Sequence, residues 1–300
     1  PRAQIVVNEK CRDLVVHLLE VDPARCLVVG DGEKLDLGGK TLQFFMTPWV
    51  HWPETMVTYA VEDRVLFSCD LFGTHHAESD LFMGDERLFH TSAKRYYAEI
   101  MMPFRKNIQE HMEKLKGIPI SIIAPSHGPV HSRPEVILAA YRDWISDSVR
   151  DEVVVCYVSM HGSTEKMVRV LCDALVERGI RVLPFNLVAT DTGELAMALV
   201  DAATVVIGTP TVLFGPHPLA VHATFLFNML RPKTRFVSII GSYGWAGNTV
   251  EALKGMLTRT KPELIEPVYI KGAPRAEDHR KLEELAAKIE EKHREIGIHG

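Results

Sequence analysis

The sequence predicts a protein of mixed α/β and α+β class, in which a mixed α and β domain precedes a doubly wound parallel sheet. From about residue 153 onward, short apolar runs alternate with helical patterns, which predicts parallel strands with helices on both faces of the sheet. The first half has closely spaced strands, and a turn at Glu62 and Asp63 is typical of a hairpin. The polar stretch YRDWISDSVRDE separates the two patterns, so we expect domains over residues 1–147 and 148–300.

The expected strands of the first domain are rich in β-branched and aromatic residues, which favour extended structure. We expect helices near residues 10–20 and 93–116. The strands, in chain order, are AQIVVN, RCLVVG, TLQFFMTP, the hairpin TMVTYAVEDRVLFSCD, and ISIIAPSHG. The first domain should therefore contain antiparallel strands.

Five strands are expected in the second domain: VVVCYV, VLPFNL, TVVIGTP, FVSIIG and IEPVYIKG. The first helix is expected from Glu165, and Gly179 stands where a helix stop is typical. Its apolar stripe, at steps of three and four residues, consists of Met167, Val170, Leu171, Ala174 and Leu175. The last helix repeats this spacing with Leu282, Leu285, Ile289 and Ile296.

Composition excludes several classes of protein. A chain of 300 residues with 46% hydrophobic and 24% charged residues is an ordinary globular protein, long enough for two cores. The net charge of −5 argues against broad nucleic-acid binding, and no concentrated basic face is evident in the sequence, so we expect no nucleic-acid partner. No apolar run reaches the roughly 18 residues of a membrane span. Five cysteines without a CxxC pair favour the reducing cytoplasm over a disulfide framework.

The segment YVSMHGSTEKM lies between an expected strand and an expected helix. A helix amino terminus presents unpaired N–H groups and a positive dipole, so small residues there suit a phosphate group. Ser159, Ser163 and Thr164 add hydroxyl groups, and Gly162 leaves the loop unobstructed. The alternative is an ordinary strand-to-helix turn that Thr164 caps.

Two later loops favour the phosphate interpretation. GTPTVLFGPHP and GSYGWAGN each follow an expected strand of the same parallel sheet. Ligands of such sheets bind at the carboxyl ends of the strands, near the point where the strand order reverses. A polar loop together with an aromatic loop containing Tyr243 and Trp245 predicts a site for a flat ring that carries a phosphate.

These three segments resemble the flavin mononucleotide (FMN) loops in the flavodoxin-like domain of the flavodiiron proteins, also called A-type flavoproteins. The resemblance implies that the phosphate is held by Ser159, Met160, His161, Gly162, Ser163 and Thr164. It further implies that the isoalloxazine ring is bordered by Pro210, Thr211 and Gly215 and closed on its other side by Tyr243, Gly244 and Trp245. Many members carry Asn where this chain has Leu213 and Phe214, a departure expected to alter hydrogen bonding to the flavin.

Three donor residues of the first domain each follow an expected strand: His51, Asp70 and His127. A single histidine is more often structural than a ligand. However, HWPET, SCDLFG and PSHGP resemble segments of the metallo-β-lactamase-like domain of the same family. The resemblance implies that His51 binds one iron, His127 the other, and Asp70 bridges both, as the catalytic centre. His75 and His76 are expected either to face the substrate pocket or to lie on the surface.

The family supplies its remaining iron ligands from an H-x-E-x-D-H segment, which this sequence lacks. PRAQIVVNEK resembles the stretch that follows that motif, so we expect the chain to begin just after it, with a partial αββα sandwich. The missing ligands were removed, lie on another polypeptide, or have been lost. We favour a fragment or split protein.

The resemblance implies reduction of O2 to water, of NO to N2O, or of both, with electrons passing through FMN to two iron ions. The expected donor is a separate rubredoxin, an NADH-dependent reductase or a reduced deazaflavin, and the expected assembly is a head-to-tail homodimer or dimer of dimers. The main alternative is an FMN electron-transfer flavoprotein with a non-functional metal domain. A zinc hydrolase and a non-enzymatic binding module are weaker alternatives.

Overall fold

The computed structural model describes residues 3–300 and divides the chain into two compact units, Pro1–Ser146 and Asp147–Gly300. The domain boundary that we expected after residue 147 lies one residue beyond this division. The polar stretch YRDWISDSVRDE includes the end of helix α4 (Pro134–Ile145) and the start of strand β8 (Arg150–Tyr157), so residues 146–149 connect the two elements.

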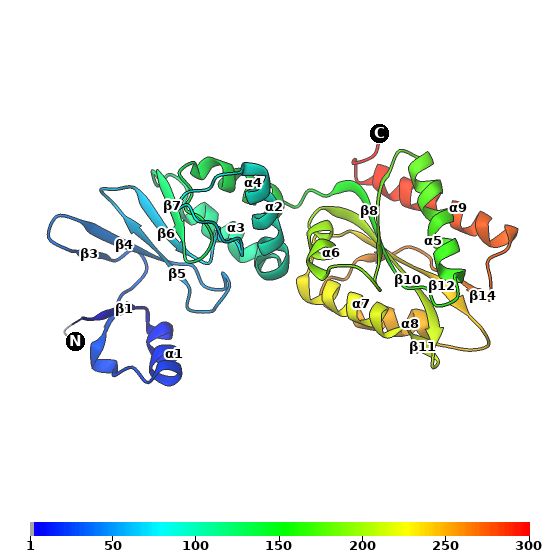
Figure 1. Cartoon of the computed structure of the whole chain (residues 1–300), viewed down its shortest axis with the longest axis horizontal. Helices are drawn as coiled ribbons and strands as arrows, with labels where there is room; N and C mark the ends of the chain where they lie inside the picture. Colours follow the sequence, from blue (N-terminus) through cyan, green and yellow to red (C-terminus); the bar gives the residue numbers. More distant parts are fainter. Residues whose placement is uncertain (1–2) are drawn as a thin grey trace. The chain divides into compact units, whose positions relative to one another are not determined.

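A five-stranded sheet forms the centre of the first unit (Figure 1). The strand order is β3-β4-β5-β6-β7; the first four strands are antiparallel, and β6 and β7 pair in parallel. The strands are β3 (Lys34–Asp36), β4 (Thr41–Met46), β5 (Met56–Ala60), β6 (Val65–Cys69) and β7 (Ile122–Pro125). The expected hairpin joins β5 to β6, with Ala60 opposite Val65. Strand β3 was not expected, because only Leu35 among its three residues is apolar.

A smaller parallel pair of strands precedes this sheet along the chain. Its elements are β1 (Ile5–Val7), α1 (Glu9–Leu19), a 3-10 turn (Pro23–Arg25) and β2 (Cys26–Val28). Asn8 caps α1, because its side-chain oxygen accepts a hydrogen bond from the Cys11 N–H. The Asn8 amide also donates to the Glu54 carbonyl at 2.6 Å and so ties this part to the loop after β4.

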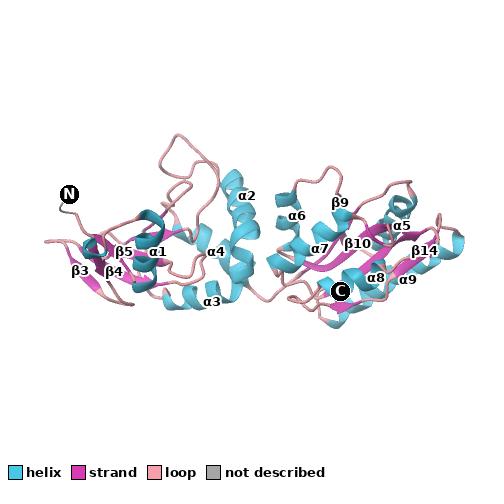
Figure 2. Cartoon of the chain, turned by 90° about the horizontal axis from the view of Figure 1, so that it is seen from below, coloured by secondary structure: helices cyan, strands magenta, loops and turns pink. Residues whose placement is uncertain are grey.

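Three helices of the first unit lie together at one side of the sheet: α2 (Glu86–Tyr96), α3 (Arg105–Lys114) and α4 (Figures 1 and 2). The helical stretch expected near 93–116 is present, but it begins earlier and is not one regular helix. A π-helical turn (Tyr97–Met101) and a 3-10 turn (Met102–Phe104) interrupt it, because Pro103 lacks the N–H that a continuous helix needs. Helix α4 was not expected from the sequence. Its Tyr141 and Trp144 form a buried aromatic cluster with Tyr97.

The second unit is a doubly wound parallel sheet, as expected. Its main strands are β8, β9 (Arg181–Asn186), β10 (Ala202–Val212), β12 (Phe236–Tyr243) and β14 (Val268–Lys271). Strand β8 lies between β9 and β10, and β12 separates β10 from β14. The strand order reverses between β8 and β10, which places their carboxyl ends at the switch point. Two short strands were not expected: β11 (Gly215–Pro216) and β13 (Glu263–Leu264).

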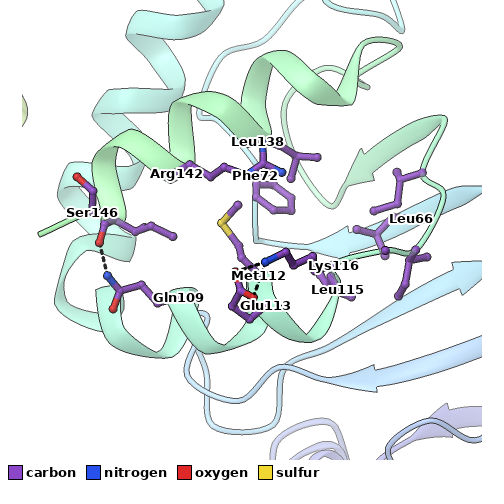
Figure 3. Close-up of a pocket in the computed structure, with 14 residues that line it drawn as sticks. Leu66, Phe72, Gln109, Met112, Glu113, Leu115, Lys116, Leu138, Arg142 and Ser146 are labelled. Carbon is purple, nitrogen blue, oxygen red and sulfur yellow. Dashed lines mark hydrogen bonds and ion pairs between the residues drawn. The ribbon is translucent and has the colours of Figure 1, made fainter.

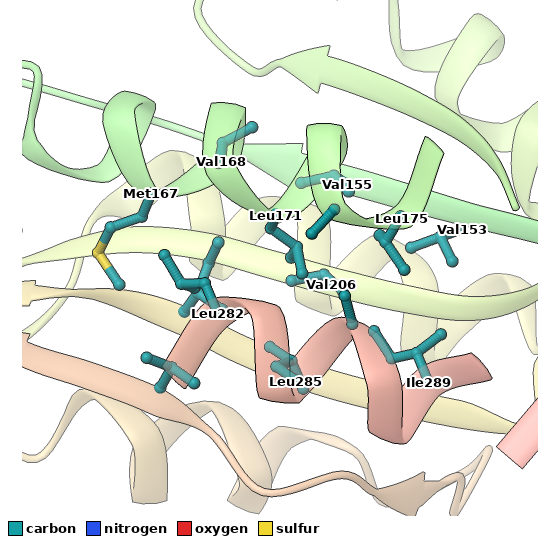
Figure 4. Close-up of a cluster of buried hydrophobic side chains, with 14 of the residues drawn as sticks. Val153, Val155, Met167, Val168, Leu171, Leu175, Val206, Leu282, Leu285 and Ile289 are labelled. Carbon is teal, nitrogen blue, oxygen red and sulfur yellow. The ribbon is translucent and has the colours of Figure 1, made fainter. Parts of the chain in front are cut away.

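Helices cover both faces of this sheet (Figures 1 and 2). One face carries α5 (Ser163–Glu177) and α9 (Ala276–Glu295), and the other carries α6 (Thr192–Leu199), α7 (Pro218–Leu230) and α8 (Thr249–Met256). Figure 4 shows Leu171 of α5, Leu285 of α9 and the sheet residue Val206 in one cluster of buried apolar side chains. Burying each such side chain contributes roughly 1.5–3 kcal/mol.

Both expected apolar stripes are present, with two differences. Val170 is only partly buried, and Ile296 follows the end of α9 and is 40% exposed. Within residues 3–300, no helix is both long enough and apolar enough to cross a bilayer.

Candidate functional sites

A cavity of about 340 Å³ lies at the carboxyl ends of β8, β10, β12 and β14. Most of the residues predicted to hold the cofactor line it: Ser159, Met160, His161, Ser163, Thr164, Pro210, Thr211, Tyr243 and Gly244. Three others do not. Gly162 caps α5, Gly215 starts β11, and Trp245 follows Gly244 at the cavity wall.

The polar end of this cavity lies at the amino terminus of α5. The Ser159 hydroxyl accepts a hydrogen bond from the Glu165 N–H at 3.3 Å and so holds the loop against the helix. The Thr164 hydroxyl is buried and has no hydrogen-bond partner in the described part of the chain. A buried hydroxyl without a partner costs about 1–3 kcal/mol, so an acceptor such as a phosphate oxygen fits there. The residues described as lining the cavity include no Lys or Arg, so N–H groups and the helix dipole would balance an anion.

The loops after β10 and β12 are packed tightly against each other. The Thr211 hydroxyl lies 2.8 Å from the hydroxyls of both Thr249 and Tyr269. The ring of Tyr243 is parallel to that of Tyr269, with centroids 6.1 Å apart. A Cβ atom on Gly247 would lie 2.6 Å from the Thr211 side chain, so only glycine permits this approach. Contacts within the chain therefore fix the positions of these two loops.

A two-residue turn, Leu213–Phe214, joins β10 to β11, with Val212 opposite Gly215. Both residues have a left-handed backbone, with φ of 49° and 69°. This conformation costs roughly 1–2 kcal/mol for each non-glycine residue. Leu213 is 93% exposed and Phe214 is 58% exposed. The rings of Phe214 and Trp245 are in edge-on contact, with their centroids 4.7 Å apart.

Sequence reasoning missed part of the lining, namely Val212, Ser242, Gly272 and Ala273. The last two belong to the loop after β14. The signal was present, because YIKG ends the fifth parallel strand at the same edge of the sheet.

The structure brings His51, Asp70 and His127 together in the first unit. The His51 Nε2 atom lies 3.4 Å from Asp70 Oδ2, and the His127 Nε2 atom lies 3.7 Å from Asp70 Oδ1. Each imidazole therefore faces a different carboxylate oxygen. Across residues 3–300, no three His, Cys, Asp or Glu side chains gather closely enough to enclose one metal ion.

The ring of His127 is oriented for ligation. Its Nδ1 atom lies 2.9 Å from the Thr74 carbonyl oxygen, which can only accept, so Nδ1 carries the proton. The Nε2 lone pair then faces Asp70, the arrangement that metal-binding histidines require. Gly73 permits this position, because a Cβ atom there would lie 2.9 Å from the His127 ring.

Two buried histidines hold the loops that carry these donors. The His111 Nε2 atom donates to the Pro48 carbonyl at 2.8 Å, beside the loop of His51. The His131 Nε2 atom donates to the Phe72 carbonyl at 3.0 Å, beside Asp70. Burial lowers the pKa of both imidazoles and favours their neutral form. Nothing in the sequence separated these two from the other histidines of the chain.

An aromatic group adjoins His127. The Tyr96 ring lies 4.8 Å from the rings of both His75 and His127, and burial, with the Asp70 charge, raises the pKa of its phenol. His75 and His76 both line a cavity of about 450 Å³ that His127 also lines. The His76 Nε2 atom lies 3.1 Å from Glu78 Oε1. Both histidines therefore face a pocket. Tyr96 gave no signal in the sequence, because it lies inside a helix far from the donor segments.

Another cavity of the first unit, of about 550 Å³, lies between α3 and α4 (Figure 3). Apolar side chains such as Met112 and Leu138 line it, and Lys116 pairs with Glu113 at its edge. None of the three predicted metal ligands lines it, so it is separate from the donor cluster.

Comparisons with known proteins agree with this division. A model of the ODP family beta lactamase matches residues 1–128, and a flavodoxin model matches residues 155–285. The nitric oxide reductase of Moorella thermoacetica is 34% identical over 299 residues, which cover 96% of this chain and 74% of that protein. The coenzyme F420H2 oxidase of Methanothermobacter marburgensis is 32% identical over 267 residues, which cover 86% of this chain and 66% of that protein.

Among solved structures, the rubredoxin oxygen:oxidoreductase from Desulfovibrio gigas superposes with a TM-score of 0.91 at 28% identity. The match covers 95% of this chain and 73% of that one. The two units are therefore a metallo-β-lactamase-like unit followed by a flavodoxin-like unit, as expected. The chain belongs to the flavodiiron, or A-type flavoprotein, family.

Proposed function

We propose that this protein is a flavin- and iron-dependent oxidoreductase that reduces O2 to water, NO to N2O, or both, with electrons from a separate donor. One observation carries the proposal. The same chain holds a phosphate-and-ring cavity in one unit and, in the other, a carboxylate whose two oxygens face separate imidazoles. The names of the relatives support this reaction class and the use of rubredoxin or F420H2 as donor. An NADH-dependent reductase is a third candidate donor.

The residues of the carboxyl-end cavity fit FMN. The unpartnered Thr164 hydroxyl and the amino terminus of α5 would hold the phosphate, and Tyr243 with Trp245 would flank the ring. Bound FMN accepts electrons in pairs and releases them singly. The close packing of Thr211 against Gly247 would hold together the two loops on the ring side of the cavity.

The donor cluster fits one side of a dinuclear iron centre. Asp70 would bridge two ions, with His51 on one and His127 on the other, and imidazole with carboxylate is a donor set that iron accepts. Such a centre supplies a place where O2 or NO receives electrons. Three donors fill only part of the coordination of two ions, so a stable centre requires further ligands.

Assembly and location complete the proposal. The head-to-tail homodimer or dimer of dimers is supported by family membership, and light scattering of the purified protein tests it. Five free cysteines support a reducing compartment, the cytoplasm.

The test is analysis of the purified protein for metal and flavin, followed by measurement of O2 and NO consumption with reduced rubredoxin or F420H2. We expect one flavin and two irons per chain. Flavin without iron or gas consumption would favour the alternative, an FMN electron-transfer flavoprotein with a non-functional metal domain. The incomplete donor set is the observation that favours this alternative. A colourless protein that takes up no FMN would overturn both.

A further inference from the structure

We infer that the cavity between α3 and α4 binds an amphiphilic monocarboxylate, a molecule of the fatty-acid class with one carboxylate head and an apolar body. The carboxylate would pair with Arg142, and the apolar body would fill the space between the helices. This site is separate from the proposed function, because the residues that line it include none of those that line the flavin cavity and none of the predicted metal ligands.

The cavity has the size and the wall of a small-molecule site. Its volume of about 550 Å³ lies within the range of roughly 300–1,000 Å³ that is usual for such sites, whereas close-packed interiors contain few voids larger than a water molecule. Apolar side chains of both helices, such as Met112 and Leu138, line it (Figure 3). Leu66 and Phe72 also belong to the lining and are fully buried. An apolar body placed here would therefore contact both helices and the buried core of the first unit.

Helix α4 brings one positive charge to this apolar wall. Leu138, Arg142 and Ile145 follow one another at steps of four and three residues, so they share one face of the helix, and all three line the cavity. Figure 3 shows the Arg142 side chain extending from α4 toward Phe72. Arg142 is exposed, so its guanidinium lies where a ligand head can reach it from solvent.

Arg142 differs from the other polar side chains of the lining because it has no ion pair or hydrogen bond within residues 3–300. The Lys116 Nζ atom lies 3.0 Å from a carboxylate oxygen of Glu113, so these two charges balance each other. The Gln109 amide and the Ser146 hydroxyl each donate to a backbone carbonyl. The cavity therefore retains one uncompensated positive charge, which matches a single negative charge on the ligand.

The chemistry of this charge selects a carboxylate. A guanidinium presents parallel N–H groups that both oxygens of a carboxylate can accept from, and such charge-assisted pairs are stronger than neutral ones. A second charge on the ligand would lie against Met112 and Leu138 without a partner, which weakens binding. An uncharged alcohol would fill the cavity and leave Arg142 without its anion.

The experiment is isothermal titration calorimetry of the purified full chain with decanoate, decanol and decyltrimethylammonium, each below its micelle concentration. We expect decanoate to bind about tenfold more tightly than decanol, because it gains a hydrogen bond between charged groups. The decyltrimethylammonium cation should bind most weakly of the three. Octanoate should bind about tenfold more weakly than decanoate, because it buries two fewer CH₂ groups.

Two variants separate the head from the apolar body. Arg142→Gln should raise the Kd for decanoate about tenfold and leave the Kd for decanol unchanged. Met112→Glu adds a carboxylate to the lining that competes for Arg142, so it should weaken decanoate binding more than decanol binding. Arg87→Gln is the matched control, because Arg87 is an exposed arginine of α2 that does not line the cavity, and it should keep wild-type affinity for both ligands.

Equal affinity of the wild-type chain for decanoate and decanol would overturn the inference, as would unchanged decanoate binding in Arg142→Gln. Absence of decanoate binding to the wild-type chain would also overturn it. Iron and flavin measured in the same samples report on the proposed function independently, because neither predicted site shares a residue with this cavity.

Discussion

The two candidate sites of this protein are built in different ways. The carboxyl-end cavity is lined by the ends of several strands of one parallel sheet and by the loops that follow them, so many residues share its surface. The donor cluster depends on three side chains, and contacts far away in sequence orient them, such as Thr74 with His127 and His111 with the loop of His51. A site made by loops distributes its binding over many groups. A site made by a few side chains depends on each of them.

The largest expected effect follows from this dependence. Asp70→Ala removes the carboxylate that both imidazoles face, so iron affinity, and with it iron per chain, should fall at least about tenfold, because losing even a contact that supports a ligand typically costs about 10- to 100-fold. Flavin per chain should stay unchanged. Metal analysis and the flavin absorbance of the same sample measure both.

Asp63→Ala is the control, because Asp63 is an exposed acid in the turn that joins β5 to β6, and it pairs with Lys40 and not with His51 or His127. It should retain wild-type iron. Unchanged iron in Asp70→Ala would show that the carboxylate is not a shared ligand, and the comparison between the two sites would then lose its basis.

The flavin-site loops could be predicted because their signals are local. Apolar runs followed by Gly- and Ser-rich turns mark the carboxyl ends of parallel strands, and the fold brings such ends to one edge. This reasoning reached Ser159, Thr211 and Tyr243 without knowledge of the strand order. His51, Asp70 and His127 were found through resemblance, and the structure places them together, although their role as iron ligands stays a prediction.

Other features could not be predicted, because they arise from contacts between distant segments. No signal in the sequence marked His131, yet it is buried and donates a hydrogen bond to the Phe72 carbonyl. Tyr96 gains its altered environment only when α2 packs beside Asp70. The left-handed backbone of Leu213 and Phe214 contradicts the preference of both residue types, so no propensity argument could have predicted it.

A pair of glycines allows a crossed test of the two sites. In Gly73→Ala the new Cβ would lie 2.9 Å from the His127 ring, and in Gly247→Ala it would lie 2.6 Å from the Thr211 side chain. The first variant should lower iron affinity about 10- to 100-fold and spare FMN, since it displaces a ligand as loss of its supporting contact would. The second should weaken FMN binding and spare iron.

Gly255→Ala provides the control for the glycine pair, because a Cβ there meets nothing within 4 Å and the residue lies in α8. It should raise the free energy of unfolding by roughly 0.5–1 kcal/mol and leave the affinities for iron and for FMN unchanged. Loss of both ligands in either test variant would mean that the two sites do not respond independently to local packing.

A smaller effect is expected at the phosphate end of the cavity. Thr164→Val removes a buried hydroxyl that has no partner within the described residues, so the flavin-free protein should be no less stable. The Kd for FMN should rise about tenfold, because a hydrogen bond to a charged group is lost. In Thr224→Val, by contrast, the lost hydroxyl donates to the Ala220 carbonyl, so stability should fall by about 1 kcal/mol at unchanged FMN affinity. Equal FMN affinity in Thr164→Val and wild type would remove Thr164 from the phosphate site.

The smallest expected effect concerns pH and the loop of His51. Burial lowers the pKa of His111, with Lys114 adding to the shift, while its hydrogen bond to Pro48 and the charges of Glu110 and Asp31 oppose it. The unfolded chain therefore binds a proton near pH 6.5 that the folded chain binds only at lower pH, and stability falls as pH decreases through this range. One such group changes the free energy of unfolding by at most about 1.4 kcal/mol per pH unit. His111→Gln keeps a donor for the Pro48 carbonyl and cannot titrate, so urea unfolding between pH 7.5 and 5.5 should show a shallower slope than wild type. An identical slope in the two proteins would mean that protonation of His111 does not contribute to the acid sensitivity of the first unit.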